Sequence, residues 1–151
     1  MKTAWLFLLT TGALMTADDR SKGDLDKLHG TWLTVSLVNN GKTIAGDKTP
    51  RTSGPETKLV YDGDKWKIQV GDQIVASGIF KVDATKSPKE IDIFDETGVK
   101  NEKTKLGIYE LNDDTYKYCL APANKPRPTE FVSKEGSGVS LGVSKREKAA
   151  P

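Results

Sequence analysis

The chain has 151 residues, which is the length of one domain of ordinary size. Charged residues make up 29% and hydrophobic residues 36%, so a mainly membrane-embedded chain and a disordered chain are both excluded. Lys plus Arg number 23 and Asp plus Glu number 21, and this near balance argues against a nucleic-acid partner. The one Cys, Cys119, cannot form an internal disulfide, and the one His, His29, argues against a His-based metal site or catalytic triad.

The amino-terminal segment predicts a secretory signal peptide over residues 1–17. Lys2 supplies the positive start, residues 4–15 form a mainly apolar run, and the small Ala17 precedes a charged stretch. The run is too short to cross a bilayer, which needs about 20 residues. We therefore expect export to the periplasm, the cell envelope or the medium, with no transmembrane segment after cleavage. The alternative interpretation of the run is a buried amphipathic helix.

The next part of the chain predicts a short helical turn and a first strand. The apolar spacing in residues 21–28 allows one helical turn, which Gly30 ends. Residues 31–38 (TWLTVSLV) are rich in β-branched and apolar side chains and predict a strand. Turn residues follow at 39–41, and 42–57 has no clear hydrophobic period. We therefore expect a long loop over 42–57.

Two hairpins are indicated by turn chemistry between alternating stretches. Residues 58–61 and 65–70 flank Asp-Gly-Asp, and residues 105–111 and 115–120 flank Asn-Asp-Asp. Apolar and charged side chains alternate along 65–70, which is typical of a strand with one buried and one wet face.

The remaining predicted strands are 73–82, 90–94, 130–133 and 139–145. Gly78, inside the first of these, indicates a bulge or a bend. Residues 95–103 are polar and predict a turn or loose loop, and three prolines make 121–128 irregular.

Eight or nine short strands joined mainly by hairpins predict an all-β domain. No helix of three turns is expected after the signal peptide, so the crossover helices of a parallel sheet are absent. An antiparallel up-and-down sheet of eight strands removes its edges by closing into a barrel. We therefore predict an eight-stranded barrel, with a β-sandwich as the alternative.

Residues near the two ends of this domain resemble the lipocalin and calycin pattern. Gly30-Thr31-Trp32 begins the first strand, and Val143-Ser144-Lys145-Arg146 ends the last one. In that group a G-x-W motif packs its indole under an Arg from the end of the barrel. The resemblance implies that Gly30, Trp32 and Arg146 close the barrel, with Arg146 stacked on Trp32 by a cation–π contact.

The chain between these motifs is similar to a lipocalin-like domain that is widespread in planctomycete bacteria. The matching stretches are LHGTW (28–32), GIFKVD (78–83), KSPKEID (86–92), GIYEL (107–111), YCLAP (118–122), RPTEF (127–131) and Lys145-Arg146. The resemblance implies a lipocalin-like barrel domain over residues 24–148, followed by a frayed tail at 149–151.

Four residues are candidate ligand contacts or polar anchors: Cys119, Arg127, Glu130 and Phe131. A polar group placed at a barrel mouth can orient a ligand. The alternative for Cys119 is a small buried hydrophobe, and for Arg127 and Glu130 a loop-fixing salt bridge or solvated charges. Carboxylates at Asp83, Glu90 and Asp92 could pair as acid and base or bind a cation, but alternating carboxylates are typical of the wet face of a strand.

These observations predict no catalytic residues, no metal site and no cofactor. We expect an exported, monomeric, lipocalin-like binding protein for a small hydrophobic ligand or a protein partner. A structural or interaction module of the cell envelope with a filled core is the alternative, and an enzyme is the third hypothesis.

Overall fold

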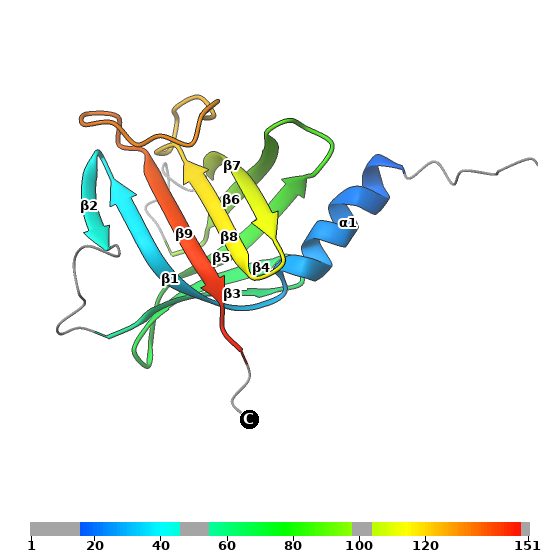
Figure 1. Cartoon of the computed structure of the whole chain (residues 1–151), viewed down its shortest axis with the longest axis horizontal. Coiled ribbons are helices and arrows are strands. Elements are labelled where there is room, and N and C mark those ends of the chain that lie inside the picture. Colours follow the sequence, from blue (N-terminus) through cyan, green and yellow to red (C-terminus); the bar gives the residue numbers. More distant parts are fainter. Residues whose placement is uncertain (1–15, 46–54, 98–103, 149–151) are drawn as a thin grey trace, which may run out of the picture.

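An antiparallel barrel with one helix at its end forms the described part of the chain, residues 16–45, 55–97 and 104–148, in the computed structural model (Figure 1). The elements are α1 (Ala17–Leu28), β1 (Gly30–Asn39), β2 (Lys42–Ala45), β3 (Thr57–Asp62), β4 (Lys65–Val70), β5 (Gln73–Asp83), β6 (Lys89–Asp95), β7 (Thr104–Asn112), β8 (Thr115–Leu120) and β9 (Ser140–Arg146). Most of the predicted signal peptide, residues 1–15, and the predicted tail at 149–151 lie outside the described residues.

Eight strands close into a barrel through the pairing of the first strand with the last. β1 and β3 to β9 pair antiparallel in chain order, and β9 returns to pair with β1. β2 adds a ninth strand alongside the far end of β1. The predicted up-and-down barrel is therefore confirmed, and the closing β1–β9 ladder is incompatible with the sandwich alternative.

The helix is longer than the sequence predicts. α1 has 12 residues, more than three turns, whereas a single turn at 21–28 was expected. It begins early because Thr16 and Asp19 form a capping box, in which each side chain accepts a hydrogen bond from the other residue's backbone N–H. The expectation that the domain holds no helix of three turns is therefore wrong.

Two further expectations are corrected by the strand assignment. The loop expected over 42–57 contains β2 at Lys42–Ala45 and the first residue of β3. No strand forms at 130–133, where the backbone N–H of Val132 donates to the carbonyl oxygen of Glu130 instead of to a neighbouring strand. This segment lies in the long connection between β8 and β9.

Gly78 marks a close approach of two strands. A Cβ at this position would lie 1.9 Å from the carbonyl oxygen of Phe94 on β6. The irregular register between β4 and β5 is at Ile68 and Gln69, so the bulge is not at Gly78 itself. The glycine is needed where β5 passes from its pairing with β4 to its pairing with β6.

Aromatic side chains fill the interior at the barrel end where β1 begins, which we call the closed end. Trp32 is fully buried there, and its ring centroid lies 5.7 Å from that of Tyr116. Tyr61 packs edge-on against both Phe80 and Tyr116, with centroids 4.8 and 5.7 Å apart. Rings in such tilted contacts contribute more than their buried area alone. This half of the barrel is therefore solid core.

Residues 121–139, which we call the strap, join β8 to β9 across the opposite end of the barrel (Figure 1). We call that end, where β8 stops and β9 starts, the mouth. The strap is tied to the β1–β2 turn, because the Gly41 N–H donates to Ser133 Oγ and the Gly138 N–H donates to Asn40 Oδ1. The strap thus forms part of the rim of the mouth.

Candidate functional site

The closed end is sealed by the contact that the family resemblance implies. Trp32 and Arg146 are directly paired positions of β1 and β9, and the guanidinium carbon lies 4.1 Å from the centroid of the indole. Arg146 Nη1 donates to the carbonyl oxygen of His29 at 3.0 Å, and Nη2 donates to that of Lys27. The Trp32 indole N–H donates to the carbonyl oxygen of Leu28 at 2.8 Å. Two strands therefore hold the carboxyl end of α1 in place.

A partly buried ion pair between Asp24 and Lys89 fixes the middle of α1 to the barrel. Asp24 is 6% exposed, and its Oδ2 accepts from Lys89 Nζ and from the Tyr109 hydroxyl, both at 2.7 Å. Burial, and then the nearby carboxylate of Asp24, raise the pKa of Tyr109 well above its usual value. The hydroxyl therefore stays protonated and donates to the carboxylate, which makes this cluster a structural anchor.

Arg127 pins the strap to the outer face of the barrel wall. Its Nη1 donates to the carbonyl oxygens of Ile91 at 3.1 Å and Gly107 at 2.7 Å. Its Nη2 lies 2.7 Å from Asp92 Oδ1, an ion pair without hydrogen-bond alignment, and its Nε lies 3.5 Å from Glu90 Oε2. The Arg127 guanidinium is therefore bound by groups of the protein itself, with Glu90 and Asp92 as its counter-ions. This arrangement matches the alternative in which Arg127 fixes a loop by a salt bridge.

The other three candidate residues also lie along the strap or beneath it. Cys119 is fully buried, its thiol lies 3.7 Å from the carbonyl oxygen of Val132, and burial raises its pKa. Phe131 packs under the ammonium of Lys117, 4.4 Å from the ring centroid, and Glu130 is exposed. None of these residues lines the mouth of the barrel.

A hollow of about 420 Å³ opens at the mouth. It is lined by Leu37, Asn39, Ile68, Lys105, Tyr118, Leu120, Ala121, Pro122, Ala123, Gly138 and Ser140. These residues come from β1, β4, β7, β8, β9 and the strap, so the barrel wall surrounds the hollow on several sides. The volume lies within the range of about 300–1,000 Å³ that is typical of small-molecule sites.

Tyr118 forms the floor of this hollow. Its ring lies against Gly142 on β9, where a Cβ would come within 2.2 Å of the ring carbon Cζ. The ring also packs at a tilt against Tyr116 of the closed-end core, with centroids 5.5 Å apart. Burial raises the pKa of Tyr118 to about 12, so its hydroxyl is neutral at physiological pH. One ring therefore separates the open half of the barrel from the filled half.

Lys105 is the one charged side chain among the residues that line the hollow. It is half-buried, and none of the ion pairs in the described part of the chain involves it. The hollow therefore combines mainly apolar walls with two uncharged polar side chains, Asn39 and Ser140, and one cation. Lys105 is not among the candidate site residues predicted from the sequence. Lys105 lies two residues before Gly107 and four before Tyr109, so the three share one face of the strand. This spacing is the signal that could have placed Lys105 inside the barrel.

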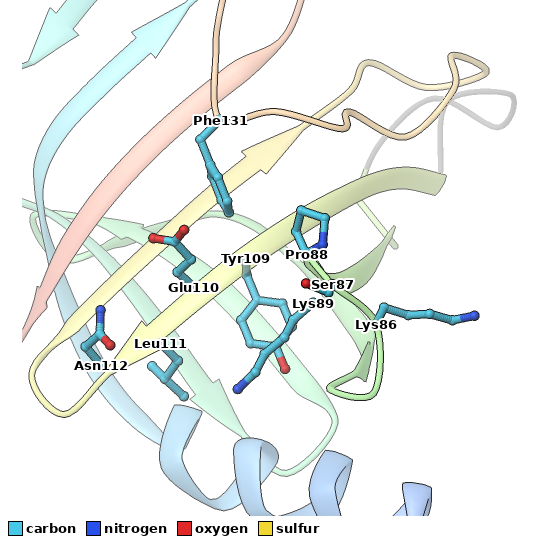
Figure 2. Close-up of a pocket in the computed structure, with 9 residues that line it drawn as sticks. All are labelled: Lys86, Ser87, Pro88, Lys89, Tyr109, Glu110, Leu111, Asn112 and Phe131. Atoms are coloured by element: carbon cyan, nitrogen blue, oxygen red, sulfur yellow. The ribbon is translucent and has the colours of Figure 1, made fainter.

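A second hollow, of about 530 Å³, lies on the outer surface between the β5–β6 turn, β7 and Phe131 (Figure 2). Figure 2 shows the polar ends of Lys89 and Tyr109 directed toward α1, where both groups bind Asp24. Glu110 faces Lys117 at 3.9 Å. Because Lys89, Tyr109 and Glu110 already have protein partners, we regard this hollow as a surface cleft beside the anchor of α1.

Other features bear on the chemistry of the chain. Among the described residues no three His, Cys, Asp or Glu side chains are grouped so that they could hold a metal ion. In the same part of the chain no helix is long and apolar enough to span a membrane. Comparisons with protein-family models, with curated proteins and with solved structures find no match to this chain.

Proposed function

We propose that this protein is an exported, lipocalin-like binding protein that holds a small, mainly apolar molecule in the mouth of its barrel. The observation that carries the proposal is the hollow of about 420 Å³ with largely apolar walls. The Trp32–Arg146 contact at the closed end supports the lipocalin-like interpretation. The apolar run at residues 4–15 supports export.

The filled half of the barrel supports the binding role by keeping the hollow in shape. The aromatic core below Tyr118 is packed ring on ring, and packed interiors deform little. A preformed site loses less conformational entropy when a ligand enters, which favours affinity. The same filled core favours the second candidate function, a structural or interaction module with no ligand.

A dye-binding experiment separates these two candidates. The probe is 1-aminoanthracene, a compact and uncharged fluorophore whose emission rises in apolar surroundings. The test variant is Ser140→Trp, which places a large ring in the hollow, because Ser140 lines it. The matched control is Lys145→Trp on the same strand, at an exposed position that does not line it.

The binding proposal predicts saturable binding of one dye per chain in the parent and in Lys145→Trp. In Ser140→Trp we expect the affinity to fall by about tenfold or more, because the ring occupies the ligand volume. Absence of saturable binding in the parent favours the structural module. Equal binding in Ser140→Trp and Lys145→Trp places the dye elsewhere on the surface.

A further inference from the structure

The electrostatic character of the mouth hollow is one-sided. Lys105 lines it without an acidic side chain among the other lining residues, and no described carboxylate forms an ion pair with Lys105. Asn39 and Ser140 add uncharged polar groups. A half-buried ammonium with no counter-ion among the described residues attracts an anion from solution more strongly than it attracts a neutral molecule.

The place of Lys105 along β7 puts this charge near the rim. β7 begins at Thr104 near the mouth and runs to the closed end, where Tyr109 binds Asp24 of α1. Side chains of Lys105, Gly107 and Tyr109 share the inner face because residues alternate along a strand. Lys105 is the inward position of β7 nearest the mouth, so a group bound to it stays close to water.

The depth available below that charge is limited. The ring of Tyr118 covers Gly142 and rests on Tyr116, and the core beneath is filled. A ligand body that enters past Lys105 meets Leu120 and then this ring. The apolar part of the ligand must therefore be short.

We infer that the mouth hollow selects a compact organic monoanion: an apolar body with a single carboxylate, held with the carboxylate at Lys105 and the body ending on Tyr118. This inference rests on the proposed function and specifies its ligand. It predicts discrimination by charge and by length, each of which can be measured separately.

The test of charge uses two competitors of equal length, octanoate and 1-octanol, which displace 1-aminoanthracene at pH 7.5. Octanoate should bind at least about tenfold more tightly than 1-octanol in the parent. Lys105→Met should abolish this difference, because octanoate loses the ammonium that attracts its carboxylate. Lys65→Met, at an exposed position of β4, should keep the difference and serves as the control for lost net charge.

The test of length uses straight-chain carboxylates from octanoate to hexadecanoate. Each methylene that enters free apolar space should tighten binding by about fourfold. We expect this gain to stop once the hollow is full, and Tyr118→Ala should move the limit to longer chains. Folding of each variant is checked beforehand by circular dichroism.

The outcomes distinguish the inference from the function on which it rests. If 1-octanol competes as well as octanoate in the parent, the inferred role of Lys105 is overturned while the mouth remains a binding site. If affinity keeps rising through hexadecanoate, the inferred depth limit is overturned. If neither the dye nor either competitor binds, the proposed function fails together with the inference.

Discussion

The contact between Trp32 and Arg146 gives a prediction whose magnitude follows from the structure. Trp32 is fully buried, and a Trp side chain buries about 150–250 Å², or roughly 4–6 kcal/mol at about 25 cal/mol per Å². The Ala side chain still buries part of this surface, so Trp32→Ala should lower the free energy of unfolding by about 3–5 kcal/mol. Such a loss is a large part of the stability of a domain of this size.

Arg146→Ala should cost less, about 2–3 kcal/mol. The substitution removes the cation–π contact, worth about 1–2 kcal/mol when half-buried, and two hydrogen bonds to the carbonyl oxygens of Lys27 and His29. The ion pair with Asp114 adds little, because the two groups are 3.9 Å apart and Asp114 is exposed. Arg146→Lys keeps the charge but loses the planar fork, so its cost should be intermediate.

Urea unfolding of the parent, both single variants and the double variant completes the cycle. Because the two side chains share one contact, the double variant should be about 1–2 kcal/mol less damaged than the sum of the singles. Strict additivity would show that the stacking carries no energy. A Trp32→Ala protein as stable as the parent would refute the account of how the barrel is closed.

Three further predictions follow from burial. The Cys119 thiol should react slowly with a thiol reagent in the native protein and quickly after denaturation, because burial hides the thiol and raises its pKa. Rapid stoichiometric labelling of the native protein would contradict this. Gly142→Ala should lower the free energy of unfolding in urea by about 1–3 kcal/mol, because the added Cβ meets the Tyr118 ring, and by much less in a Tyr118→Ala background. Equal losses in both backgrounds would mean that the Tyr118 ring does not lie on Gly142. All four tyrosines have raised pKa values in the folded state, so the stability they contribute should be constant below about pH 10 and fall as the pH rises from about 10 toward 12. Absorbance at 295 nm should show almost no tyrosinate in the native protein at about pH 10, and ionisation at that pH would contradict the buried aromatic core.

The barrel could be predicted from local turn chemistry. Asp-Gly-Asp at 62–64 and Asn-Asp-Asp at 112–114 lie between stretches of β-forming residues, and both predicted hairpins are present. Hairpins leave only antiparallel neighbours, so closure of eight strands is the simplest way to remove the edges. The length of α1 was missed because its capping residue, Thr16, lies in a stretch that also has the features of a cleavage site.

The candidate site could not be placed from the sequence. The polar residues of the strap stand out between prolines, but the strap folds over the outer wall, where Arg127 finds two backbone carbonyl oxygens. Lys105 has no distinctive neighbours, and its inward direction depends on which face of β7 carries Tyr109. The depth of the hollow depends on the packing of Tyr118 over Gly142, two residues that are distant in sequence. Such long-range packing leaves no local pattern.

The central claim is that a small molecule binds in the mouth of the barrel. Its most direct test is a two-dimensional amide NMR titration of the parent protein with 1-aminoanthracene. The largest shifts should occur at the residues around the hollow, including Leu37, Leu120 and Ser140, with little change at Trp32 in the closed end. Shifts centred on the outer cleft near Pro88, or no saturable shifts at all, would contradict it.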